Sequence, residues 1–270
     1  MIVEASSSRS ERRLRAATIG PDAEARGSGA VGREVTTSVV GRARFRVGVA
    51  RERVVDAWRF RPPRLREPLF SPERELARIA ERRRRVDADP SFELLDYETH
   101  QPVLLDLLEH LPDARMIELG IGYASTPIVL GRTGASLSLE TEPLWYRRFR
   151  RYASDAHRLE LVRDFDEREW QSDHLRAEWD VALVDNSPGT SRQRNLLALA
   201  ERTRFVVCHD TQECFRPAPS RFGWDFSSFG HVFTYTRFAT YTTVVSNHES
   251  IPLDHLPGVA GPPPCSGGGA

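Results

Sequence analysis

Two apolar segments of the chain each end in a short run of residues that could carry out chemistry. The segment "WDVALVDN" ends in Asp185 and Asn186, and the segment "RFVVCHDT" ends in His209, Asp210 and Thr211. Carboxylates and imidazoles hold cations or move protons near neutral pH. Because ligands bind outside the carboxyl ends of the strands of a parallel sheet, we predict one site that contains both runs.

We predict catalytic roles for Asp185, His209 and Asp210 in this site. The carboxylates of Asp185 and Asp210 could meet as an oxygen-rich cation site suited to Mg²⁺. His209 could be a base, since its ordinary pKa is about 6.5, or it could be a buried structural histidine. Successive strand residues point to opposite faces, so we expect only one of His209 and Asp210, namely Asp210, to point directly into the site.

The elements that would position these runs alternate regularly along the chain. Apolar strand candidates separated by helical segments predict an α/β fold, in which a Rossmann-like, doubly wound and mostly parallel sheet has helices on both faces. The last two strand candidates leave no room for a helix between them, so we expect an antiparallel hairpin to close the sheet. The predicted strands are 116–119, 135–140, 159–162, 181–185, 205–209, 231–237 and 240–247.

A glycine-rich turn follows the first of these strands, in "IELGIGYASTP". Gly120 and Gly122 would let a ligand approach the backbone beside the amino terminus of the next helix. Glu140 lies 20 residues after Gly120, at the end of the second strand, where a carboxylate can accept both hydroxyl hydrogens of a ribose. The alternative for the two glycines is a plain tight turn that binds no ligand. The alternative for Glu140 is a solvated acid near the start of a helix.

The residues around this turn resemble the first motif of class I S-adenosylmethionine-dependent methyltransferases. That motif is an acid, any residue, and then two glycines separated by one residue, which Glu118, Gly120 and Gly122 match. Ser125 stands where a dinucleotide-binding turn would have its third glycine, which argues against a dinucleotide. The resemblance covers about residues 115–247, roughly half of the chain.

The resemblance also implies which residues bind the cofactor. The acid and the two glycines of the motif would cradle the methionine part of S-adenosylmethionine, and Glu140 would hold its ribose. The acid after the third strand, Asp164 or Asp166, would lie beside the adenine. The antiparallel closing hairpin is a further feature of that family.

The acids at the two strand ends resemble those of metal-dependent O-methyltransferases of the catechol and macrocin type. This resemblance implies methyl transfer to the hydroxyl of a small-molecule or glycan-like acceptor, with Mg²⁺ held by Asp185 and Asp210. The chain departs from that group in two ways: it contains no lysine, the base that the group has after the fourth strand, and its fifth-strand motif is His-Asp-Thr instead of Asp-Asn or Asp-Asp.

Two other functions stay open from the sequence. The missing lysine and the altered fifth-strand motif are also compatible with a catalytically idle module that binds or senses S-adenosylmethionine. The basic residues, all 38 of them Arg, are concentrated at the amino end, where residues 1–85 hold 21 Arg against 11 acids. An Arg-rich arm of this kind could dock a nucleic-acid methyltransferase on its substrate.

Composition also predicts how the chain is divided and where it works. We expect residues 1–67 to be a loosely ordered, Arg-rich extension, 68–250 a single methyltransferase-like domain, and 251–270 a disordered tail rich in Pro and Gly. Three cysteines without a CxxC pair fit a reducing compartment. Because no segment resembles a signal peptide or a membrane span, we expect a cytoplasmic protein with no membrane partner.

Overall fold

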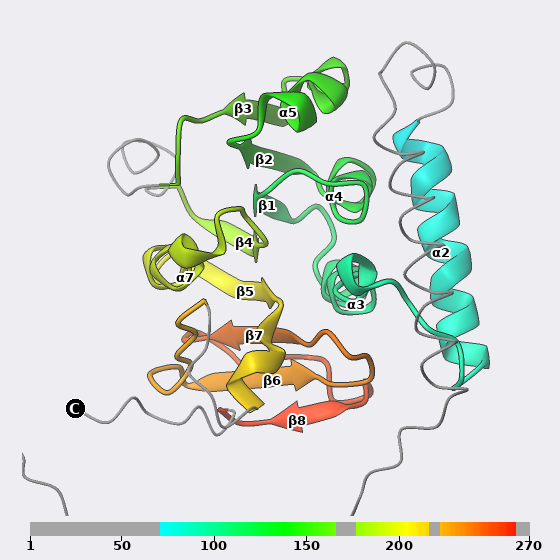
Figure 1. Ribbon diagram of the computed structural model, residues 1–270, viewed down its shortest axis with the longest axis vertical. Helices are drawn as coiled ribbons and strands as arrows, with labels where there is room; N and C mark the ends of the chain where they lie inside the picture. The colour runs from blue at the N-terminus through cyan, green and yellow to red at the C-terminus, as the bar shows by residue number, and fades with distance from the viewer. Residues whose placement is uncertain (1–70, 166–176, 216–221, 263–270) are drawn as a thin grey trace, which may run out of the picture. The chain divides into compact units, whose positions relative to one another are not determined.

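A single mixed sheet of eight strands forms the centre of the computed structural model, which describes residues 71–165, 177–215 and 222–262. The strand order is β3-β2-β1-β4-β5-β7-β6-β8 (Figure 1). The expectation for residues 1–67 falls outside the described residues. The strands are β1 Arg115–Leu119, β2 Ala135–Glu140, β3 His157–Leu161, β4 Trp179–Val184, β5 Thr203–His209, β6 His231–Tyr235, β7 Thr242–Ser246 and β8 Gly258–Ala260.

The pairing of these strands confirms the predicted fold class. Strands β1 to β5 pair in parallel, β7 runs antiparallel to β5, and β6 runs antiparallel to β7. The sheet is therefore Rossmann-like and is closed by the expected antiparallel hairpin. Strand boundaries differ from the predicted ones by one or two residues, which is the usual scatter for strand ends.

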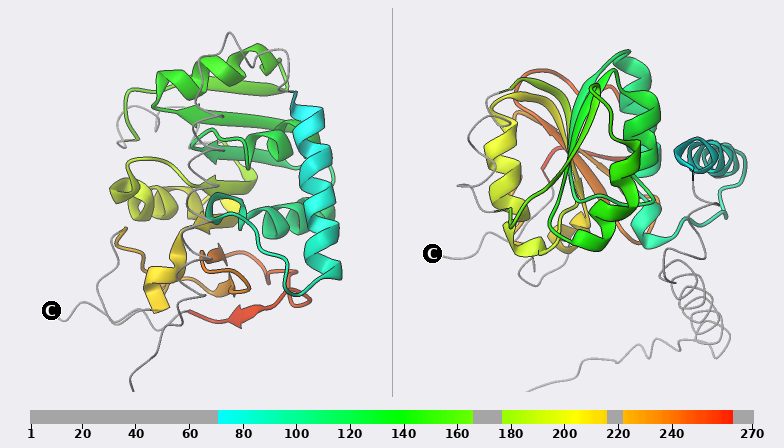
Figure 2. Two further views of the ribbon diagram at one scale, coloured as in Figure 1. Left: turned by 45° about the vertical axis from the view of Figure 1, so that its right-hand side comes forward. Right: turned by 90° about the horizontal axis from the view of Figure 1, so that it is seen from above.

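Helices cover both faces of the sheet. Helices α3 and α4 lie on one face and α7 on the other, while α2 lies outside α3 and α4 (Figure 2). The Ser71 hydroxyl caps α2 by accepting the amide of Arg74, and Glu142 caps α5 by accepting the amide of Leu144. The helices are α2 Pro72–Ala88, α3 Gln101–His110, α4 Thr126–Arg132, α5 Pro143–Phe149 and α7 Arg192–Ala200, with short 3-10 turns η2 Asp96–Glu98, η3 Arg150–Tyr152, η4 Gly189–Ser191 and η5 Thr211–Phe215.

Strand alternation divides the core between the two faces. Met116, Leu183 and Val207 pack with α3 and α4, whereas Leu119 and Val184 pack on the side of α7. This alternation fixes the face on which any residue just beyond a strand end will lie. None of the helices within 71–165, 177–215 and 222–262 is both long and apolar enough to span a bilayer.

The segment after the hairpin corrects the prediction of a disordered tail that starts at residue 251. Strand β8 pairs antiparallel with β6, and Ile251, Leu253 and Leu256 are buried in the core. Spaced apolar side chains, rather than the frequent Pro and Gly, decide the structure there, because their burial offsets the entropy lost on ordering. Residues 263–270 lie outside the described residues.

Candidate functional site

The carboxyl ends of β1, β2 and β4 meet at one edge of the sheet. Hydrogen bonds continue the ladder one residue past the strands: the Gly120 amide donates to the Leu139 carbonyl at 2.9 Å, and the Asp185 amide donates to the Leu119 carbonyl at 3.0 Å. The predicted glycine turn and the predicted acid Asp185 therefore lie side by side. This is the edge at which open α/β sheets bind ligands.

Gly120 is required at this edge by the backbone itself. Its φ is +97°, and a Cβ built on it would lie 2.8 Å from the carbonyl oxygen of Asp185. Gly122 differs, because a Cβ there would meet nothing closer than 3.9 Å. The two glycines of the motif therefore differ: Gly120 is needed for the turn itself, whereas the backbone at Gly122 has room for a Cβ.

We expect Gly120→Ala to lower the free energy of unfolding by roughly 2–3 kcal/mol, because it combines a strained φ with a backbone clash. Gly122→Ala is the matched control and should change stability by less than about 0.5 kcal/mol. Urea unfolding of the two variants measures both effects. Equal stability of the two variants would contradict the reason given for Gly120.

Glu140 ties the end of β2 to the glycine turn. Its Oε2 accepts the Ile121 amide at 2.8 Å, and its Oε1 accepts the amides of Thr141 and Glu142, each at 2.8 Å. Burial raises the pKa of this carboxyl above its ordinary value, although the three amides oppose the shift. A carboxylate has about four lone-pair sites, so Oε2 retains the capacity to accept a ligand hydroxyl.

Glu118 lies beneath the glycine turn and is completely buried. Its carboxylate accepts the hydroxyls of Thr126 at 3.0 Å and Ser138 at 2.6 Å, and the Thr126 hydroxyl in turn accepts the Gly122 amide at 2.9 Å. Glu118 therefore supports the turn from below through Thr126. Glu118 was predicted to contact the ligand, but its buried carboxyl group has no exposed surface with which to do so.

Burial raises the pKa of Glu118 from 4.5 to about 7. The folded state then holds this proton more tightly than the unfolded state, so stability is lost as the pH rises from 4.5 through 7. Between pH 5 and pH 8 the loss from this group should be about 2–3 kcal/mol.

We expect Glu118→Gln to remove that part of the pH dependence. Urea unfolding at pH 5 and pH 8 should show the variant gaining stability on the wild type by about 2–3 kcal/mol between the two pH values. Glu109→Gln, an exposed site on α3, is the control and should leave the pH profile unchanged. Parallel profiles for wild type and Glu118→Gln would contradict the buried, protonated carboxyl.

Asp185 and His209 are neighbours because of the strand register. Val184 pairs with Cys208 across β4 and β5, so the next residue on each strand lies opposite the other on the face of α3. The His209 Nδ1 lies 3.2 Å from the Asp185 Oδ1. The structure therefore turns His209 toward Asp185, where we had expected Asp210.

The other ring nitrogen of His209 is held by the segment that precedes α3. Its Nε2 lies 3.1 Å from the Asp96 carbonyl oxygen and 3.0 Å from the Thr99 hydroxyl. The Thr99 hydroxyl donates its own proton to the Asp96 carbonyl, so both partners must accept from Nε2. The Nε2 atom therefore carries a proton, and Nδ1 faces Asp185.

The charges of Asp185 and His209 support each other. Burial acts to lower the pKa of His209, but the Asp185 carboxylate outweighs burial and raises the pKa above its ordinary value. Burial acts to raise the pKa of Asp185, but His209 and Arg192 outweigh it and hold that pKa far below its usual range. Asp185 is therefore ionised at every working pH.

Arg192, the first residue of α7, overturns the prediction that Asp185 and Asp210 form a Mg²⁺ site. Its Nη2 donates to Asp185 Oδ1 at 2.9 Å, and its Nη1 donates to Asp210 Oδ2 at 2.8 Å. The guanidinium also donates to the carbonyls of Asp185, Asn186 and His209. Because this cation already lies between the two carboxylates, Mg²⁺ does not fit there.

Asp210 reaches Arg192 because the chain turns sharply after β5. Its φ is +63°, in the left-handed region that Asp tolerates better than most residues. The side chain of Asp210 therefore leaves the alternation of β5, and strand alternation cannot predict its direction.

The acid predicted to lie beside the adenine follows β3. Asp164 is exposed three residues after β3, and the alternative acid Asp166 lies outside the described residues.

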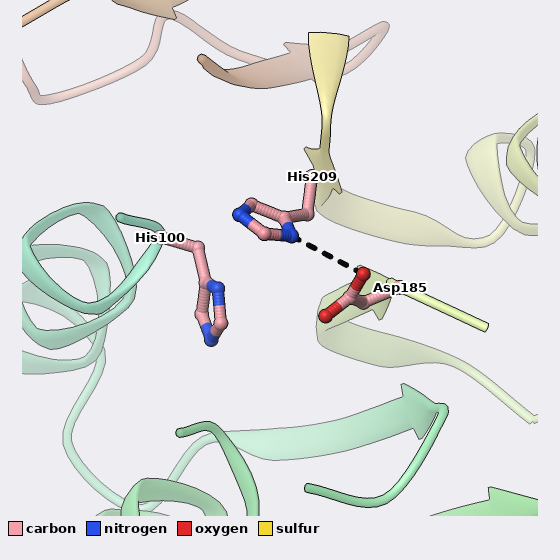
Figure 3. A group of neighbouring side chains, drawn as sticks. All are labelled: His100, Asp185 and His209. Carbon is pink, nitrogen blue, oxygen red and sulfur yellow. Dashed lines mark hydrogen bonds and ion pairs between the residues drawn. The ribbon is translucent and has the colours of Figure 1, made fainter. Parts of the chain in front are cut away.

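His100, the residue before α3, is part of the same cluster, although nothing in the sequence pattern indicated it. It is completely buried, and its ring lies 4.7 Å from that of His209, centroid to centroid, at 75° (Figure 3). Burial is the main cause that lowers its pKa to about 3, so the ring is neutral. A lone histidine before a proline-containing helix gives no local signal of such a role.

No family model and no curated protein sequence matches the chain. Solved structures do match: an rRNA methylase from Streptococcus thermophilus is 12% identical over 53% of this chain and 93% of its own, with a TM-score of 0.38. The O-methyltransferase TomG from Streptomyces achromogenes, in complex with S-adenosylmethionine, is 17% identical over 64% and 89%, with a TM-score of 0.40. An RNA methyltransferase from Salinibacter ruber, in complex with S-adenosylhomocysteine, is 20% identical over 57% and 95%, with a TM-score of 0.36. The fold class rests on the strand order, not on these scores.

Proposed function

We propose that the chain is an S-adenosylmethionine-dependent methyltransferase that acts on the hydroxyl of a small-molecule or glycan acceptor. The observation that carries this proposal is the joined pair of the Gly120 turn and Glu140 at the carboxyl edge of the sheet. That pair lies beside Asp185, so a cofactor and an acceptor would meet at one edge. Fold alone does not imply a function, whereas this site supplies specific groups for a ligand.

Residues of the glycine turn and of β2 would hold the cofactor. The absence of a side chain at Gly122 would let a ligand lie against the backbone before α4. Glu140 would accept the ribose hydroxyls, and Glu118 would position the turn through Thr126. When bound, S-adenosylmethionine supplies an electrophilic methyl group on a sulfonium. Asp164 stays our prediction for the residue beside the adenine.

Asp185 would orient the acceptor. Its side chain is 24% exposed, whereas that of His209 is 3% exposed and both nitrogens of His209 already face other groups. The carboxylate of Asp185 can accept the hydrogen bond of an acceptor hydroxyl and hold its oxygen toward the methyl group, while the proton that the hydroxyl loses passes to solvent. His209 and Arg192 are positioning residues, because they act by fixing Asp185. Correct placement of the reacting groups is a large source of rate in such displacements.

Calorimetry tests the cofactor part of the proposal. Glu140→Ala removes the carboxylate that would accept the ribose hydroxyls, so we expect its affinity for S-adenosylmethionine and S-adenosylhomocysteine to fall by about 10-fold to 100-fold. Glu109→Gln, on the exposed side of α3, should bind as the wild type does. If the wild type bound neither ligand, or if Glu140→Ala bound both with unchanged affinity, the proposal would fail.

A further inference from the structure

His100 is an unexplained polar side chain in the interior. It has no exposed surface, and neither of its ring nitrogens has a hydrogen-bond partner among the residues that the structure describes. Buried polar groups are nearly always satisfied, and a group without a partner requires an explanation. The imidazole faces the Asp185–His209 pair (Figure 3). A ligand between the three side chains would satisfy it.

The three side chains are close enough to share one ion. One ligand atom from each of His100, Asp185 and His209 lies within 4.8 Å of the others, and the His209 Nδ1 to Asp185 Oδ1 distance is 3.2 Å. Bonds of about 2.0–2.1 Å in a tetrahedral zinc site place the ligand atoms about 3.3 Å apart. Modest side-chain rotations would close the cluster on an ion. The hydrogen bond from Arg192 uses Asp185 Oδ1, so Oδ2 can also serve as a ligand atom.

The contacts behind His209 are those of a metal-ligating histidine. Its Nε2 donates to the Asp96 carbonyl and to Thr99, which leaves Nδ1 directed at Asp185. Ligating histidines nearly always donate their other ring nitrogen to a carbonyl, a carboxylate or a water.

We propose that His100, Asp185 and His209 bind a divalent transition-metal ion of the zinc type. Two imidazoles and one carboxylate favour such an ion over Mg²⁺, which prefers oxygen ligands. The charge of Arg192 does not forbid it, because Asp210 pairs with the same guanidinium. This site differs from the predicted one in its ion, and it replaces Asp210 with the two histidines. It does not depend on whether the chain transfers methyl groups.

The test is a Zn²⁺ titration of the full-length, metal-free protein, without S-adenosylmethionine. We expect one Zn²⁺ ion to bind the wild type and to raise its melting temperature. His100→Gln should weaken Zn²⁺ binding by more than about 100-fold, because it removes one of three ligands. The control is His255→Gln, since His255 belongs to another histidine pair, with its ring 6.4 Å from that of His110 and bonded to Asp106. The control should bind Zn²⁺ as the wild type does.

Two further measurements keep the test decisive. Urea unfolding of metal-free His100→Gln checks that the variant folds. If it does not fold, the test is the Co²⁺ absorption spectrum of the wild type, which should show the visible bands of a site with nitrogen ligands. The proposal is overturned if the wild type binds no Zn²⁺, if folded His100→Gln binds it as tightly, if the Co²⁺ bands are absent, or if Mg²⁺ binds as strongly as Zn²⁺.

Discussion

Replacing Arg192 with methionine should lower the free energy of unfolding by about 3–5 kcal/mol, the cost of leaving buried charges without their partner. Arg192 is 6% exposed and pairs with both Asp185 and Asp210. Without its guanidinium, the two carboxylates lose their shared cation, and the carbonyls that end β4 and β5 lose their donors. Both strand ends of the site depend on this one side chain.

Urea unfolding of Arg192→Met beside Arg194→Met measures this effect. Arg194 lies on the same helix, is exposed, and donates to the Phe165 carbonyl at 3.3 Å, so its replacement should cost less than about 1 kcal/mol. Arg192→Lys should be intermediate, because an ammonium cannot form the same fork. If Arg192→Met lowered the free energy of unfolding by less than about 1 kcal/mol, the claim that Arg192 holds the two strand ends together would be contradicted.

Asp185→Asn should lower methyl transfer by about 10²-fold, the usual cost of misplacing a reacting group. The amide has no negative charge to hold the acceptor hydroxyl, and it gives His209 Nδ1 a weaker partner. Affinity for S-adenosylmethionine should change by less than about threefold, because Glu140 and the glycine turn are intact. The rate is the release of S-adenosylhomocysteine with a panel of phenols, catechols and methyl glycosides as acceptors.

The comparison variant for Asp185→Asn is Asp164→Asn, which replaces an exposed acid. Because Asp164 is our prediction for the residue beside the adenine, its replacement should weaken cofactor binding and leave the rate at saturating cofactor unchanged. Equal rates in Asp185→Asn and wild type would contradict the role of Asp185. A wild type that binds the cofactor but transfers methyl to no acceptor in the panel would favour the sensing module over the enzyme.

Local signals carried most of the fold prediction. The apolar strands and the short hairpin depend on neighbouring residues, so the parallel sheet and its antiparallel closure could be predicted without any tertiary information. The glycine turn and Glu140 could be placed at one edge because parallel strands end together. The prediction of a disordered tail from residue 251 was wrong, because it rested on the Pro-rich and Gly-rich composition and gave no weight to three spaced apolar residues.

The details of the site depended on tertiary facts that the sequence does not display. The register of β4 and β5 makes His209, not Asp210, the neighbour of Asp185. The positive φ of Asp210 and the position of Arg192 at the start of α7 then turn the second carboxylate to a guanidinium. His100 enters the cluster from a segment 85 residues before Asp185 and 109 residues before His209.

Hydrogen exchange with and without S-adenosylhomocysteine tests the central claim, that the cofactor binds at the Gly120–Glu140 edge. We expect slower exchange in peptides that cover residues 120–125 and 140–144, where the turn and the end of β2 would contact the ligand. An open cavity of about 660 Å³ at the opposite ends of the strands, lined by Arg115, Trp179 and Arg204 among others, should show no change. Unchanged exchange at the glycine turn, or protection only at that cavity, would contradict the account.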